Sequence, residues 1–190
     1  MILRNALPLI GALLAGCVSL PQPHGITRDT VQDFAIEGRF ALRAVVAGEA
    51  PRNGAGRLDW THRQDSDRIL LANPLGHTLA EIEVKPGRSQ MRTSNGGLIE
   101  SNDPDSLIEA VTGQRLPVTR MPRWLLGRGG PEAEIERDAH RRPVRLTESG
   151  WQITYVYDDT DPAALPSRLT LMRSDEIELK IRIETWKTQP

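Results

Sequence analysis

Glu176-Ile177-Glu178-Leu179-Lys180-Ile181-Arg182-Ile183-Glu184 decides the fold, because charged and apolar side chains alternate through this stretch without a break. Successive side chains of a β-strand point to opposite faces, so the isoleucine and leucine side chains share one face and the charged ones share the other. Strict alternation of this kind is typical of a strand with one buried face. The sequence therefore predicts a half-buried strand near the C-terminus.

A second long stretch, Phe34 to Val46, repeats the pattern near the N-terminus, with Glu37, Arg39 and Arg43 on the charged face. Shorter candidates lie between the two stretches and are separated by Gly, Pro, Asn and Asp. They are centred on Leu58–Trp60, Ile69–Leu71, Ala80–Val84, Trp151–Tyr157 and Leu169–Leu171. Many short strands joined by turn residues favour an antiparallel sandwich or barrel over alternating strand–helix units.

Two short helices are expected among these strands. Asp103-Pro104 combines a capping residue with proline at the first helical position, and Gly113 marks the end of that helix. A second helix is predicted from Pro122 to Leu126. The segment from Gly48 to Gly54 is predicted to be a polar linker. The segment from Gly127 to Arg142 is rich in glycine and charge, and the sequence leaves its structure open.

The first 16 residues have the layout of a secretory signal peptide. Arg4 precedes an apolar stretch, Ala6 to Leu14, that is too short to span a bilayer. The stretch ends in Leu14-Ala15-Gly16-Cys17, the pattern of a bacterial lipobox, in which cleavage before the cysteine follows attachment of a diacylglycerol to its sulfur. The alternative is an ordinary signal peptide cut nearby, which would leave Cys17 as a free thiol. We expect a cleaved signal peptide over 1–16, a lipidated N-terminus and tether over 17–33, and one domain over 34–190.

Composition excludes several classes of function. The 190 residues fit a single domain, and 24 basic against 25 acidic side chains give no field that would attract a nucleic acid. A single cysteine cannot form an internal disulfide or a Cys-based zinc site, and the four histidines are isolated from one another. The chain has no phosphate-binding loop, dinucleotide fingerprint or nucleophile elbow. We expect no cofactor, no metal and no enzymatic activity.

Carboxylates are plentiful, and a solvated surface has two alternatives for them, a calcium-binding loop and a catalytic carboxylate pair. The run Asp158-Asp159-Thr160-Asp161 lacks the central glycine and the closing glutamate of a calcium-binding loop, so it is predicted to be a solvated hairpin turn. A paired-carboxylate site of the glycosidase kind is not excluded by sequence alone.

The turn Asn73-Pro74-Leu75-Gly76 joins two of the predicted strands. Asn at the first position, Pro at the second and Gly at the fourth are typical of a type I turn, which places Leu75 at the tip. The side chain can fold back onto the barrel or project as an apolar finger that touches a membrane. Removing a leucine side chain from water is worth up to about 1.5–3 kcal/mol.

From Phe34 to about Trp186 the chain resembles the LolB family, outer-membrane receptors that complete lipoprotein localisation in Gram-negative bacteria. The landmarks, besides the lipobox, are Gly38-Arg39-Phe40, Trp60, Asn73-Pro74-Leu75-Gly76, Leu116-Pro117-Val118, Pro122-Arg123-Trp124-Leu125-Leu126-Gly127, Gly150-Trp151, Tyr155, Pro166, Leu169, Leu171 and the strand that ends at Trp186. No single landmark is decisive, but their order and spacing are specific together.

The resemblance implies a mainly β fold, an open, incomplete antiparallel β-barrel with an α-helical lid over an apolar cavity. It also implies a monomer that accepts lipoproteins from the periplasmic carrier LolA by binding their acyl chains. Insertion of the cargo into outer-membrane lipid would be assisted by Leu75 and would need no nucleotide. Val18 follows the cysteine where an inner-membrane retention signal would place Asp, so attachment to the outer membrane is expected.

The cavity is expected to be lined by the inward phase of the strands and by the lid. The candidates are Phe40, Leu42, Trp60, Ile82, Trp124, Leu125, Trp151, Ile153, Tyr155, Leu169, Leu171, Ile177, Leu179, Ile181 and Ile183. Ordinary core packing is the alternative for each of them, and a register slip of one residue would invert the phase. Two other functions are also compatible with the sequence: a shuttle or lipid-binding lipoprotein without transfer activity, and a structural envelope lipoprotein.

Overall fold

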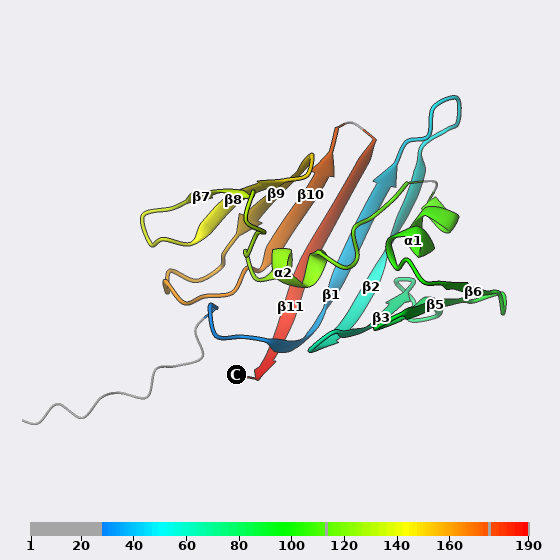
Figure 1. Ribbon diagram of the computed structural model, residues 1–190, viewed down its shortest axis with the longest axis horizontal. Coiled ribbons are helices and arrows are strands. Elements are labelled where there is room, and N and C mark those ends of the chain that lie inside the picture. Colours follow the sequence, from blue (N-terminus) through cyan, green and yellow to red (C-terminus); the bar gives the residue numbers. More distant parts are fainter. Residues whose placement is uncertain (1–27, 113, 175, 190) are drawn as a thin grey trace, which may run out of the picture.

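The computed structural model describes residues 28–112, 114–174 and 176–189 (Figure 1). The predicted signal peptide, Cys17 and the tether up to residue 27 lie outside the described residues. Within the described ranges, no helix is long and apolar enough to cross a membrane.

The described residues form one antiparallel sheet of eleven strands in the order β6-β5-β4-β3-β2-β1-β11-β10-β9-β8-β7. The strands are β1 (Asp33–Ala44), β2 (Arg52–Arg63), β3 (Ser66–Ala72), β4 (Thr78–Lys85), β5 (Arg88–Thr93), β6 (Leu98–Ser101), β7 (Glu134–Arg137), β8 (Pro143–Glu148), β9 (Trp151–Val156), β10 (Arg168–Arg173) and β11 (Ile177–Gln189). The order is linear, with β6 and β7 as its two edges, so the sheet curves without closing. The predicted open, mainly β architecture is confirmed.

Strands β6 and β7 are consecutive in sequence but lie at opposite edges of the sheet. Their connection must therefore cross one face, and it carries both helices, α1 (Asp105–Thr112) and α2 (Met121–Leu125). Figure 1 shows the two helices on the same side of the central strands. The predicted lid is this connection.

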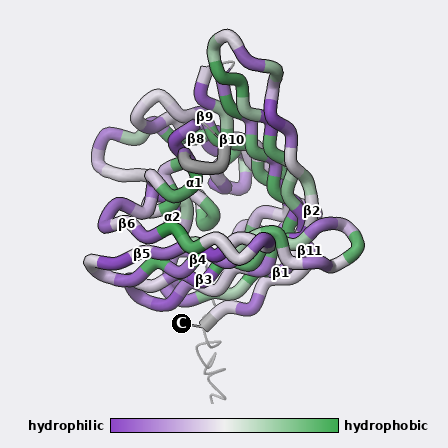
Figure 2. The backbone as a smooth tube through the Cα atoms, turned by 90° about the vertical axis from the view of Figure 1, so that its right-hand side faces the viewer, coloured by the Kyte–Doolittle hydropathy of each residue, from purple (hydrophilic) through white to green (hydrophobic). Residues whose placement is uncertain are grey.

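The two stretches that predicted the fold, β1 and β11, pair antiparallel at the centre of the sheet, with Phe40 opposite Ile181. The register shifts between Glu37 and Gly38, which is a β-bulge. A side chain at Gly38 would place its Cβ 2.1 Å from the carbonyl oxygen of Arg182, so the close approach of the two strands requires glycine there. Hydrophobic and hydrophilic residues alternate along the strands (Figure 2).

Several boundaries differ from the expectations. Strand β1 ends at Ala44 rather than Val46, and the expected polar linker contains the start of β2, because Arg52 pairs with Ala44. Strands β5 and β6 were not predicted, since β5 carries a single large apolar residue, Met91, and has no alternation to detect. The segment that the sequence left open leaves the lid at Gly127 and forms β7 at the sheet edge.

Candidate functional site

A cavity of about 290 Å³ lies between the helix-bearing connection and the sheet from β11 through β1 to β5. Only Arg52, Asn53 and Thr93 among its lining residues carry polar side chains. The other lining residues are Phe40, Leu42, Gly54, Leu58, Trp60, Ile69, Leu71, Leu79, Ala80, Ile82, Met91, Ile108, Leu116, Val118, Met121, Leu179 and Ile181. The volume lies just below the range of about 300–1,000 Å³ that is usual for small-molecule sites, and the wall suits an apolar ligand.

The structure divides the predicted cavity residues into two groups. Six of them line the cavity: Phe40, Leu42, Trp60, Ile82, Leu179 and Ile181. The other nine are buried outside its lining, in the hydrophobic core: Trp124, Leu125, Trp151, Ile153, Tyr155, Leu169, Leu171, Ile177 and Ile183. The same strand phase therefore supplies a cavity wall in one half of the sheet and packed core in the other.

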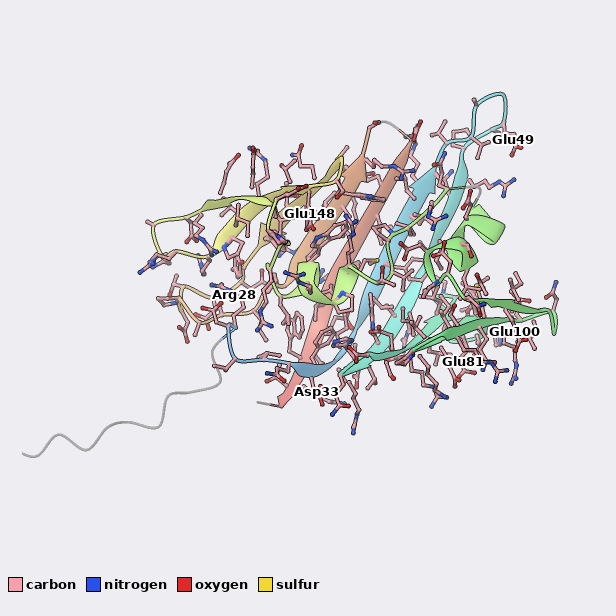
Figure 3. The ribbon with its side chains drawn as sticks, viewed as in Figure 1. Arg28, Asp33, Glu49, Glu81, Glu100 and Glu148 are labelled. Atoms are coloured by element: carbon pink, nitrogen blue, oxygen red, sulfur yellow. The ribbon has the colours of Figure 1, made fainter. Side chains whose placement is uncertain are left out.

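Helix α2 explains this division, because it is seated on the half formed by β8 to β11. Glu148, labelled in Figure 3, accepts at Oε2 from the Trp124 indole N–H at 2.7 Å, and the Tyr155 hydroxyl donates to the Trp124 carbonyl oxygen at 2.9 Å. The rings of Trp124 and Trp151 lie 6.0 Å apart. Burial, with the nearby charges of Tyr157 and Glu148, raises the pKa of Tyr155 above its usual range, so its hydroxyl stays a donor. These aromatic side chains fill the space that a cavity would need.

Several lining residues were missed by sequence reasoning, and the signals for them differ. Leu58 shares the phase of Trp60, so it could have been found. Ile108 lies on the apolar stripe of α1. Leu79 is out of phase with Ile82 on β4, and Met91 lies in an otherwise polar strand. The alternation of apolar and polar residues therefore does not predict that either side chain faces the cavity.

A buried carboxylate outside the cavity lining, Asp67, holds the lining residue Trp60 in place. Asp67 Oδ1 accepts from the Trp60 indole N–H at 2.7 Å and lies 2.8 Å from His62 Nδ1. Asp67 is 8% exposed, so these partners compensate for its burial. This hydrogen bond fixes the orientation of the largest aromatic side chain in the cavity wall.

The turn between β3 and β4 presents Leu75 to solvent with 84% of its surface exposed. Asn73 Oδ1 accepts from the backbone N–H groups of Leu75 at 2.9 Å and His77 at 3.0 Å. Gly76 adopts φ +93°, a conformation that side chains disfavour. The turn therefore holds Leu75 away from the barrel.

The acidic run Asp158–Asp161 lies in the connection between β9 and β10, where Asp158 pairs with Arg168 at 2.9 Å. Among the residues described, no group of three or more His, Cys, Asp and Glu side chains could hold a metal ion.

The family model and the related sequences agree on one family. The family model described as "Outer membrane lipoprotein LolB" matches residues 32–186. A protein named outer-membrane lipoprotein LolB from Dechloromonas aromatica is 58% identical over 190 residues, which is 100% of both chains. The protein of that name from Pseudomonas fluorescens is 32% identical, over 93% of this chain and 91% of its own. Among solved structures, a LolA superfamily protein from Nitrosomonas europaea aligns with a TM-score of 0.46 and 10% identity, over 82% of this chain and 86% of that one.

Proposed function

Since the chain belongs to the LolB family of outer-membrane lipoproteins, we propose that it is a lipid-anchored receptor that accepts other lipoproteins and inserts them into the outer membrane. In this proposal the cavity takes up the acyl chains of the cargo. The lipid anchor is attached to Cys17, and the donor is the periplasmic carrier LolA. The receptor acts as a monomer.

The observation that carries the proposal is the apolar cavity in an open sheet. Each methylene of an acyl chain costs about 0.8 kcal/mol to expose to water, so a lipoprotein with several chains cannot cross the periplasm uncovered. A cavity lined by leucine, isoleucine and aromatic side chains covers such acyl chains and does not select for a particular headgroup. Its chemistry fits an acyl chain better than any polar ligand.

Transfer through such a cavity needs no chemical step. Acyl chains move from carrier to receptor and from receptor to bilayer as long as each acceptor binds them more tightly than the previous one. The chain supplies a covered site of intermediate affinity. Leu75 supplies a contact with the bilayer, because its side chain is already exposed and gains free energy on leaving water.

The test uses the full lipidated chain in phospholipid vesicles, mixed with a purified complex of LolA and a triacylated lipoprotein. We expect the lipoprotein to leave the carrier and to float with the vesicles only when the receptor is present. Lipoprotein that stays on the carrier at the level of empty vesicles would refute the proposal.

A substitution at the turn separates uptake from insertion. Leu75→Glu should still remove the lipoprotein from the carrier but should reduce its insertion into vesicles by about tenfold, because a carboxylate does not enter the bilayer. Leu98→Glu is the matched control, since Leu98 is also exposed, at 53%, and does not line the cavity. Equal insertion by both variants would remove Leu75 from the mechanism.

A further inference from the structure

The burial of the lining residues shows where the cavity opens. Trp60, Ile82 and Met91, toward one end of the strands, are buried. The exposed lining residues are Arg52, Asn53 and Leu79, and they lie at the opposite end, where β2 and β4 begin. The cavity is therefore closed toward the β2–β3 turn and has its mouth at the end of the sheet that carries the β3–β4 turn.

Leu71 and Leu79 connect this mouth to the turn that holds Leu75. They lie on the two strands of the β3–β4 hairpin, on either side of the turn, and both line the cavity. Leu79 is also 38% exposed. One hairpin thus carries an exposed leucine at its tip and a partly exposed leucine at the mouth.

A β-bulge directs Leu79 toward the cavity. Leu71 pairs with Ala80 and Ala72 pairs with Thr78, so Leu79 has no partner residue in the register. Regular alternation would point Leu79 to the outer face of β4 together with Glu81 (Figure 3), whereas in the structure Leu79 and Ala80 both line the cavity. Re-aiming a side chain is the usual structural effect of a bulge.

Neighbouring backbone groups hold the bulge in place. The Ser94 N–H donates to the Leu79 carbonyl oxygen at 3.0 Å, and the Asn73 N–H donates to the His77 carbonyl oxygen at 2.8 Å. Across the mouth, Arg52 is paired with Glu49 at 2.9 Å, so the rim opposite Leu79 is charged. Leu79 is therefore the apolar member of the three exposed lining residues at the mouth.

We propose that acyl chains pass between the cavity and the membrane over Leu79, which acts as the threshold of the mouth beside the Leu75 turn. The inference rests on the proposed function and adds the route of the chains to it. A threshold residue contacts the chain most closely during passage, so it controls the rate of exchange in both directions. A wall residue deep in the cavity instead controls how much is bound at equilibrium.

The experiment measures exchange of a dansyl-labelled fatty acid between phosphatidylethanolamine–phosphatidylglycerol vesicles and the full lipidated chain anchored in them. Energy transfer from the tryptophans reports bound probe, because Trp60 lines the cavity. We expect Leu79→Asn to slow uptake and release by about tenfold each, the effect of covering one or two fewer methylenes during passage. The two rates should fall by a larger factor than the amount bound at equilibrium, because Leu79 is only one of the lining residues, and Leu79→Met should restore both rates.

Leu98→Asn is the matched control, because it makes the same change at an exposed leucine of the same sheet half that does not line the cavity. Three outcomes would each overturn the proposed role of Leu79 in passage of the chain. They are an unchanged exchange rate for Leu79→Asn, equal slowing by Leu98→Asn, and lower equilibrium binding by Leu79→Asn without slower exchange. A wild-type chain that takes up no probe would instead overturn the proposed function itself.

Discussion

The two halves of the sheet share the same alternation of inward and outward side chains, but one half forms a packed core and the other forms a cavity wall. Strands β8 to β10 carry large residues on their inner face, and α2 packs Trp124 against them. Strand β11 belongs to both halves, because Leu179 and Ile181 line the cavity and Ile177 and Ile183 do not. Strands β1 to β5 place Gly54 and Ala80 on the inner face beside the larger side chains, and the cavity lies between these strands and the connection that carries the helices. The cavity exists because one half of the sheet lacks the side chains that fill the other half.

The largest expected difference between the halves appears when a buried isoleucine is truncated in each. Ile153 in the packed half is 0% exposed and Ile82 in the cavity wall is 1% exposed. We expect Ile153→Ala to lower the free energy of unfolding by about 4 kcal/mol, since it leaves a new cavity in a close-packed core. Ile82→Ala should cost about 2 kcal/mol, because part of that side chain already faces empty space.

Denaturant unfolding of the two variants checks this prediction, and fatty-acid binding is the second readout. Ile82→Ala should change the affinity for the probe, whereas Ile153→Ala should leave it unchanged at a temperature where the variant is folded. Equal losses of stability would mean that the cavity collapses in the absence of ligand.

A smaller effect is expected from neutralising the carboxylate that holds a tryptophan in each half. Glu148 accepts from the Trp124 indole at 2.7 Å, and Asp67 accepts from the Trp60 indole at the same distance. Glu148→Gln and Asp67→Asn should each lower the free energy of unfolding by about 1–2 kcal/mol, because a hydrogen bond to a charged acceptor is replaced by a weaker one.

Only Asp67→Asn should alter the affinity for a fatty-acid probe, since Trp60 lines the cavity and Trp124 does not. Calorimetric titration with the probe measures this difference. An equal change in affinity for both variants would show that α2 communicates with the cavity.

The open β fold could be predicted from the sequence because β1 and β11 alternate between apolar and charged side chains. The two helices could be predicted because their signals, Asp103-Pro104 and Pro122, are local in sequence. Sequence reasoning did not reach β5 to β8, because these strands are only four to six residues long and each carries only one or two large apolar residues, too few to show a period. For most of the cavity wall, phase separates the inner from the outer face, as Ile82 and Glu81 show. Leu79 is the exception, because the β-bulge turns it inward out of phase. Phase carries no information on whether an inner side chain meets another side chain or empty space, because that depends on how the lid is seated.

The smallest change in stability, with a large change in binding, is expected at Gly54. A Cβ there would meet only the Phe40 ring, at 3.9 Å, so a larger side chain enters the cavity without a backbone clash. We expect Gly54→Leu to change the free energy of unfolding by less than about 1 kcal/mol, because an extended residue replaces glycine and fills existing space. The same variant should lose most of its capacity for the fatty-acid probe. Ala55→Leu adds a leucine to the exposed outer face at the next position and should bind normally. If Gly54→Leu bound the probe as the wild type does, the acyl chain would have to lie elsewhere than in this cavity, and the difference between the two halves would have no role in function.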